Sequence, residues 1–424
     1  MKTRGFLGLV ALAAITLGTS CSNDELYNDH SPENAIGFST YVGRDAQSRA
    51  SVYDDTSLKA SLDNGGGFGV FAYYTGTNGY QEAGEGVVGF KPNFMYNEDI
   101  VFNSTSSKWE YNPVKYWPNS AEEKISFFAY APFTESSSGS NITGFSANNE
   151  AGAPIVTYKV AQNVKDQKEI LWGVQKTSGK PNLDVQKQGM GQDVSFNFRH
   201  ALARIGFNVE AMIDAVNSVS TPKEDNGATT NGTIDHDILN IYVRKVELKG
   251  NFYSQGQLNL NNTTQNVANW EPQSLPTSTT TFVLEDGIVD GQPDGETSEV
   301  CHFNDIHGVV TTEKQPLNAA DSYIMVIPQK FEGPDKIKII VYYDVIVKDE
   351  KVETGEVTIP NVVDSGDFNF EFNDGKAYSF NLHIGLTSIT FSADVTDWVT
   401  GNTTSGTDGF VVNVPIVANA SANN

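Results

Sequence analysis

The amino-acid sequence predicts an all-β protein made of two tandem antiparallel β-sandwich domains. The first observation is the length, because 424 residues exceed one ordinary domain and fit two. The second is the alternation of apolar and polar side chains at period two, which is typical of half-buried strands. The third is turn chemistry, since 38 glycines and many Asn, Asp and Pro residues divide the chain into short segments.

The alternating pattern is clearest in residues 378–384 and 389–395. In both segments every second side chain is apolar, which predicts strands with one buried and one solvated face. Similar patterns predict strands in residues 68–74, 125–129, 238–248, 323–327 and 337–347. Helical periodicity is nearly absent, and the one short helical turn that we expect covers residues 201–205.

One expected strand carries apolar side chains on both of its faces. Ile125 and Phe127 point to one side, whereas Phe128 and Tyr130 point to the other. This pattern predicts a strand that is buried between two layers.

Charged residues are sparse but unbalanced in sign. The chain has 28 Lys and Arg against 52 Asp and Glu, and its formal net charge is −24. A surface of this sign repels the phosphates of nucleic acids, so we exclude nucleic acid as a partner. The same charge suits a surface that is exposed to water.

The first 20 residues have the pattern of a secretory signal. Lys2 and Arg4 form a basic region, and residues 6–17 form an apolar run too short for a stop-transfer helix. Small residues then precede Cys21, an arrangement that resembles the lipobox of bacterial lipoproteins. We therefore expect cleavage before Cys21 and acylation of this cysteine, with an ordinary signal peptide as the alternative. The acyl chain would attach the precursor to a membrane.

Candidate catalytic and metal-binding residues are few and isolated. Cys301 is the only cysteine besides Cys21, and His302 and His307 lie near it without a further group of ligands. The acidic stretch at residues 286–296 lacks the spacing of a Ca²⁺ loop, and we expect it to be solvated. No nucleophile, zinc or phosphate-loop motif is present, although a spatial pair of carboxylates stays open. The sequence therefore predicts no catalytic residue, no metal and no cofactor.

Five further segments, taken together, resemble those of one protein family. They are residues 116–119 (YWPN), 124–132 (KISFFAYAP), 198–205 (FRHALARI), 323–329 (YIMVIPQ) and 374–398, which begins with DGKAY and ends with VTDW. In this order, and after a lipobox, they resemble the fimbrillin family of the Bacteroidetes, the subunits of type V pili. Each segment also has a structural interpretation, in which His200 bonds to a turn and Trp398 caps the edge of a core.

The resemblance implies two transthyretin-like sandwiches that are exported, cleaved and polymerised. The expected divisions are residues 1–20 (lipoprotein signal peptide), 21–49 (propeptide with a removable first strand), 50–194 (N-terminal sandwich), 195–400 (C-terminal sandwich) and 401–424 (tail with a candidate donor strand). The resemblance also implies cleavage by an arginine-specific protease outside the cell. The chain would then move from the outer membrane surface, as a lipoprotein precursor, into an extracellular fimbrium.

The removable strand is expected in residues 36–42. Ile36, Phe38 and Val42 share one face of this alternating segment. Its loss would leave unpaired strand edges and an exposed apolar floor, which are costly unless another strand fills the slot.

The cleavage site that matches this scheme follows the removable strand. The expected scissile bond is Arg49–Ala50, with Arg44 as the competing site. Lys and Arg are uncommon in this region, so an arginine just beyond a strand is both accessible and selective.

The C-terminal tail offers a strand that can replace the lost one. Phe410, Val412, Val414 and Ile416 alternate on one face, as in the removable strand. Insertion into the next subunit would be β-augmentation, as in donor-strand complementation. Pro415 lacks a backbone donor and fits a strand edge or a bulge. The alternative is that the tail folds back as the last strand of its own domain.

These patterns favour a fimbrial shaft subunit whose partners are copies of itself, other fimbrial subunits and the maturation protease. A tip or anchor subunit is the nearest alternative. A surface glycan-binding lipoprotein is another, with Trp109, Trp117 or Trp270 as sugar-stacking rings. An enzyme is the weakest hypothesis. An adhesive fimbrium would also contact ligands on host or bacterial surfaces.

Overall fold

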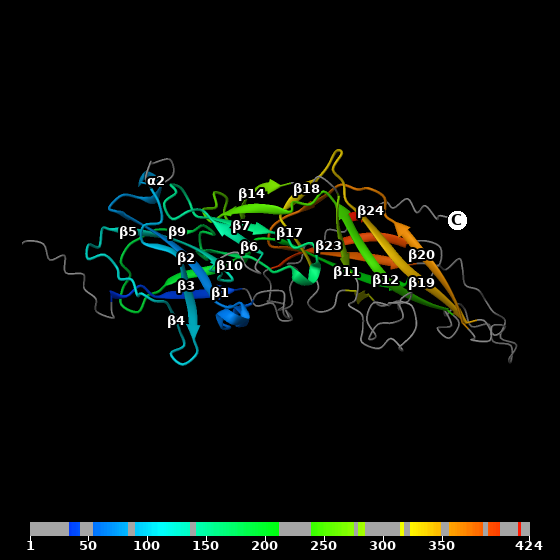
Figure 1. Cartoon of the computed structure of the whole chain (residues 1–424), viewed down its shortest axis with the longest axis horizontal. Helices are drawn as coiled ribbons and strands as arrows, with labels where there is room; N and C mark the ends of the chain where they lie inside the picture. Colours follow the sequence, from blue (N-terminus) through cyan, green and yellow to red (C-terminus); the bar gives the residue numbers. More distant parts are fainter. Residues whose placement is uncertain are drawn as a thin grey trace, which may run out of the picture.

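The computed structural model describes residues 34–42, 54–83, 90–135, 141–211, 239–274, 279–284, 314–317, 323–348, 356–384, 389–398 and 414–416. The described part is almost entirely β-structure, which confirms the predicted all-β class. The strands extend along an elongated molecule, with the N-terminal half towards one end and the C-terminal half towards the other (Figure 1). No helix in these ranges is long and apolar enough to cross a bilayer.

The N-terminal half is built around an eight-stranded sheet. Its strand order is β1-β10-β8-β5-β2-β3-β4, and β9 pairs with β5. The bounds are β1 Phe38–Val42, β2 Phe68–Gly76, β3 Met95–Asn103, β4 Lys108–Glu110, β5 Lys124–Ala131, β8 Leu171–Val174, β9 Asn182–Val185 and β10 Val194–His200. Every pair is antiparallel except β1 with β10, which is parallel.

Short helical segments connect these strands. They are α1 (Asp55–Leu58), η2 (Leu62–Asn64), α2 (Tyr80–Ala83) and η3 (Val164–Asp166). Helix α1 begins after Asp54, whose carboxylate accepts a hydrogen bond from the backbone N–H of Ser57 at 2.7 Å.

Strand β5 lies inside the sheet and is buried on both faces, as its sequence predicts. Phe128 and Tyr130 pack into the larger of two apolar clusters, here called the main core, which runs from Phe71 to Trp398. Phe127 packs into the smaller cluster on the opposite face of the sheet. We call it the β1 cluster, and it consists of Ile36, Phe38, Val42, Leu58, Phe68, Val70, Ala72, Met95, Ile100, Tyr111, Trp117, Ile125, Phe127, Ala129, Ala131, Leu171, Val194, Phe196 and Phe198.

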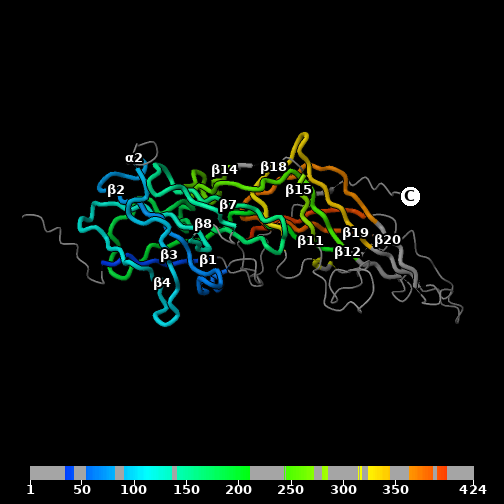
Figure 2. The backbone as a smooth tube through the Cα atoms, viewed as in Figure 1, coloured from blue at the N-terminus to red at the C-terminus, as the bar shows by residue number. Residues whose placement is uncertain are grey.

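A four-stranded sheet joins the two halves of the chain. Its order is β14-β13-β7-β6, in which β6 (Ile142–Phe145) and β7 (Ile155–Lys159) come from the N-terminal half. β13 (Gln255–Asn259) and β14 (Asn269–Ser274) come from the C-terminal half. Strand β13 pairs antiparallel with β7, and Figure 2 shows β7 and β14 in the middle of the molecule. Backbone hydrogen bonds therefore connect the halves, and the domain limits at residues 194 and 195 stay a prediction.

The C-terminal half contains the remaining three sheets. A six-stranded sheet has the order β16-β11-β22-β23-β24 with β17 on β11, a four-stranded sheet has the order β15-β12-β19-β20, and β18 pairs with β21. The bounds are β11 Ala203–Ala211, β12 Leu239–Gly250, β15 Thr280–Leu284, β16 Gln315–Pro316, β17 Ile324–Val326, β18 Gln329–Phe331, β19 Lys338–Lys348, β20 Glu356–Asp364, β21 Phe370–Phe372, β22 Lys376–Ile384, β23 Ile389–Asp397 and β24 Val414–Ile416.

The helical turn expected at residues 201–205 is wrong. Residues from Ala203 onward form β11, which runs parallel to β22 and antiparallel to β17. Ile205, Phe207 and Val209 alternate along this strand and are at most 2% exposed. Pairing on both sides of the strand therefore outweighs the local helix preference of Ala and Leu.

A buried polar pair lies where β10 leads into β11. The Nδ1 atom of His200 contacts the carboxylate of Glu169, and the two side chains are 4% and 0% exposed. The imidazole of His200 stacks on the indole of Trp398, with ring centroids 4.2 Å apart and 2° between the planes. The guanidinium of Arg204 lies over the same indole at 5.3 Å. His200 thus bonds to a buried carboxylate instead of a turn, and Trp398 is a core residue.

Removing the C-terminal half is expected to unfold the N-terminal half. A chain of residues 21–211 lacks β13, so β7 loses a backbone partner and the main core is opened. Because a domain is stable by only about 5–15 kcal/mol, we expect no cooperative thermal transition by circular dichroism. A chain of residues 21–398 keeps every described strand except β24 and is the control, expected to unfold cooperatively. A cooperative transition of the shorter chain would show that the halves fold independently.

Candidate functional site

Strand β1 forms one edge of the eight-stranded sheet (Figure 1), and β10 is its only neighbour among the described strands of that sheet. The two strands run parallel, in a register that pairs Phe38 with Val194 and Val42 with Phe198. An edge strand presents one row of unpaired backbone groups and can be exchanged without breaking a ladder on its outer side.

The side chains predicted to share one face of this strand are all buried. Ile36, Phe38 and Val42 are 2%, 3% and 1% exposed. The Phe38 ring lies among four aromatic rings at centroid distances of 5.5–6.1 Å, those of Phe68, Tyr111, Phe127 and Phe196. At about 1.5–3 kcal/mol for each buried side chain, the three contribute roughly 4.5–9 kcal/mol before opposing terms.

The residues just before β1 are held by hydrogen bonds to a neighbouring loop. The N–H of Ile36 donates to the carbonyl of Lys115 at 2.9 Å, and the N–H of Trp117 donates to the carbonyl of Asn34 at 3.0 Å. The phenol of Tyr111 donates to the carbonyl of Ile36 at 2.8 Å. Burial raises the pKa of Tyr111, so this phenol stays a protonated donor.

The apolar face of β1 is separate from the packing that joins the two halves. The β1 cluster contains no residue beyond Phe198, whereas the main core continues to Trp398. Loss of β1 would therefore uncover the β1 cluster and leave the main core closed.

The described part of the predicted donor segment is β24. It pairs antiparallel with residues 391–393 of β23, at an edge of the six-stranded sheet, and Pro415 lies opposite Ser392. Phe410 and Val412 lie outside the described residues. In this chain the slot at β10 is occupied by its own β1, and β24 pairs with β23 of its own C-terminal half (Figure 1). Donation of the tail to another copy stays a prediction.

The other predicted site residues lie outside the described part of the chain. They are Cys21, Arg44, Arg49, Ala50, Cys301, His302, His307 and the acidic stretch at residues 286–296. Lipidation and cleavage at these positions stay predictions. Within the described ranges, no group of three or more His, Cys, Asp or Glu side chains is placed to hold a metal ion.

The three tryptophans considered as sugar-stacking rings are used for packing. Trp117 is 5% exposed, and Trp109 lies edge-on to Phe68 at 4.9 Å. The indole N–H of Trp270 donates to the carbonyl of Ala201 at 2.7 Å. These contacts give the three indoles structural roles and do not favour a sugar platform on them.

The described fold and site together define a β-sandwich protein whose distinctive feature is the edge strand β1. Comparison with known families identifies the particular family. The profile described as Fimbrillin-like matches residues 48–398. The chain belongs to this fimbrillin-like family, as the five sequence segments indicate.

Two known proteins illustrate the similarity. Fimbrium subunit Fim1C of Phocaeicola vulgatus is 31% identical over 234 residues, which cover 52% of this chain and 57% of that protein. This chain thus spans little more than half the length of that relative. The crystal structure of a fimbrial protein from Bacteroides vulgatus matches with a TM-score of 0.61 at 23% identity, covering 86% of this chain and 99% of that one. This second likeness supports the fold, and neither name describes an enzyme.

Proposed function

We propose that the chain is a shaft subunit of a bacterial fimbrium and polymerises by strand exchange. The precursor is exported, acylated at Cys21 and carried to the outer membrane surface. An arginine-specific protease cuts the Arg49–Ala50 bond and frees the segment that contains β1. The tail of a neighbouring copy, residues 410–416, then fills the slot by β-augmentation and extends an extracellular fimbrium.

The observation that carries this proposal is the edge position of β1 together with its separate apolar cluster. A strand in this position can leave while the main core still holds both halves together. The vacated slot has an aromatic floor that includes Phe68, Phe127 and Phe196, which a second apolar strand can cover. The family match covers residues 48–398 and begins after β1, so all but its first two residues are ones that cleavage would retain.

Controlled cleavage of the full chain tests the proposal. Brief treatment with an arginine-specific protease is expected to give Ala50 as the new N-terminus, a ladder on a native gel and filaments by electron microscopy. Arg49→Gln should prevent all three results, whereas the matched Arg44→Gln variant should behave like the wild type. Clean cleavage that yields only monomers would contradict the shaft role and favour a tip subunit.

Deletion of the tail tests the donor strand separately. β24 adds three residues to the edge of its sheet, so a chain without residues 408–424 should remain folded. After cleavage it is expected to stay monomeric, because no strand is available to enter the slot. Filaments from this shortened chain would contradict donation by the tail.

A further inference from the structure

Strand β1 carries a polar side chain on its buried face. Side chains alternate along a strand, so Thr40 points to the same side as Phe38 and Val42. In the register with β10, Thr40 lies opposite Phe196, which belongs to the β1 cluster. One hydroxyl group therefore interrupts the apolar face that holds β1 in its slot.

The hydroxyl of Thr40 is buried without a hydrogen-bond partner. Its Oγ1 atom is enclosed, and no donor or acceptor in the described part of the chain bonds to it. An unpaired buried hydroxyl destabilises the folded state, because it has given up its hydrogen bonds to water. Water solvates the same hydroxyl once β1 has left the slot, so the bound strand is weakened by its own side chain.

The C-terminal tail has no hydroxyl on the corresponding face. Four side chains alternate on one face in each segment. In β1 they are Ile36, Phe38, Thr40 and Val42, and in the tail they are Phe410, Val412, Val414 and Ile416. Both sets contain one Ile, one Phe and one Val. They differ in composition by a single side chain, which is threonine in β1 and a second valine in the tail.

A valine comes to the place of Thr40 whichever way the tail enters the slot. Aligned in the chain direction of β1, the tail places Val414 there, and aligned in the opposite direction it places Val412 there. Valine and threonine are both branched at Cβ and have nearly the same shape. Valine can therefore fill the place of Thr40 without burying an unpaired hydroxyl.

We propose that Thr40 is a specificity residue of the β1 slot, because its hydroxyl favours replacement of the chain's own strand by a strand with valine in this place. The inference rests on the strand exchange proposed above and adds a direction to it. Before cleavage, the covalent link holds β1 beside its slot at a high effective concentration, so the slot stays filled. After cleavage this advantage is lost, and the hydroxyl favours departure of the strand.

Thr40→Val in the full chain tests the role of the hydroxyl. We expect the equilibrium constant for unfolding, measured by denaturant titration, to fall about fivefold or more. Release of the fluorescently labelled β1 segment after Arg49–Ala50 cleavage should slow by a similar factor. Thr40→Ser keeps a hydroxyl and should release the segment no more slowly than the wild type.

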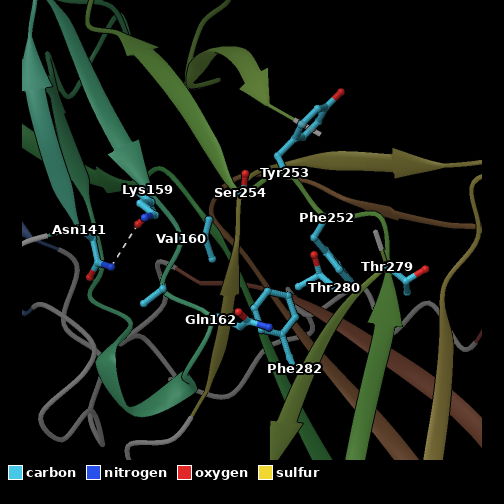
Figure 3. A pocket seen from close by; sticks show the side chains of 11 residues that line it. Asn141, Lys159, Val160, Gln162, Phe252, Tyr253, Ser254, Thr279, Thr280 and Phe282 are labelled. Carbon is cyan, nitrogen blue, oxygen red and sulfur yellow. Dashed lines mark hydrogen bonds between the residues drawn. The ribbon is translucent and has the colours of Figure 1, made fainter. Parts of the chain in front are cut away.

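Thr280→Val is the matched control, because it makes the same change outside the slot. Thr280 is half-buried and lines a pocket of about 490 Å³ between the two halves, where water can solvate its hydroxyl (Figure 3). No residue that lines this pocket belongs to the β1 cluster. Both the unfolding constant and the release rate should therefore stay within about twofold of the wild type.

A change in the tail separates the role of Thr40 from strand exchange itself. Val412→Thr/Val414→Thr puts hydroxyls on the entering strand, so filament assembly after cleavage should slow at least about fivefold, whereas Asn413→Thr, on the opposite face, should not slow it. A Thr40→Val chain that is no more stable, or that releases its segment at the wild-type rate, would overturn the inference even if the wild type forms filaments. A stabilised Thr40→Val chain together with a cleaved wild type that forms no filaments would contradict strand exchange, and not the effect of the hydroxyl on β1.

Discussion

Phe38→Ala is expected to lower the free energy of unfolding of the full-length chain by about 3–5 kcal/mol, the usual range for Phe→Ala in a core. The Phe38 side chain is 3% exposed and lies among four other aromatic rings of the β1 cluster. Truncation leaves a cavity that these rings cannot fill, because three of them lie in other strands of the sheet and Tyr111 is held by its hydrogen bond to the carbonyl of Ile36. Denaturant titration followed by fluorescence measures the loss.

Tyr41→Ala is the matched control, because Tyr41 lies on the opposite face of the same strand. Its side chain is 50% exposed, and its ring contacts the ammonium of Lys176 at 5.4 Å. An exposed cation–π contact contributes about 0.5–1 kcal/mol, so the loss should be several-fold smaller than for Phe38→Ala. Equal losses would show that the strand is held by backbone pairing and not by its buried face.

Phe38→Ala also distinguishes the stability of the full-length chain from the rate of strand exchange. If the cleaved β1 segment must leave before assembly, Phe38→Ala should release it faster, by about a hundredfold or more for a loss of 3 kcal/mol. Release of a fluorescently labelled segment after Arg49–Ala50 cleavage measures this rate. An unchanged rate together with lower stability would mean that departure of the segment is not limited by the β1 cluster.

The sequence predicts strands well where only one face of the strand is buried, because the alternation is then visible within the segment itself. Residues 378–384 and 389–395 alternate without interruption, and both lie in strands of the structure, β22 and β23. The burial of Ile36, Phe38 and Val42 follows from the same periodicity. Alternation identifies a face but not a partner strand, so the parallel pairing of β1 with β10 did not follow from it.

Long-range pairing accounts for what sequence patterns missed. The sheet that joins the halves pairs residues 155–159 with residues 255–259, and no local signal specifies this partnership. At residues 203–205 the structure contradicts the predicted helical turn, since these residues begin β11, which lies between two partner strands.

The second large effect on stability is expected from a substitution in the buried pair of Glu169 and His200. His200→Leu should lower the free energy of unfolding by about 3–5 kcal/mol, because it takes the imidazole away from a carboxylate that has no exposed surface. It also removes the ring that stacks on Trp398. The fluorescence of this indole is therefore expected to change in the folded variant.

Comparison with a double variant shows whether the loss comes from the buried acid that has lost its histidine or from the missing ring. Glu169→Leu/His200→Leu removes both polar groups and should be more stable than His200→Leu alone, because no carboxylate then remains opposite an apolar side chain. The matched control is His383→Leu, which removes the partner of Glu210 from a pair whose side chains are 24% and 29% exposed. Water can solvate that glutamate, so the expected loss is at most about 1 kcal/mol. A double variant less stable than His200→Leu would mean that the packing of His200 on Trp398, and not the burial of Glu169, makes this position sensitive.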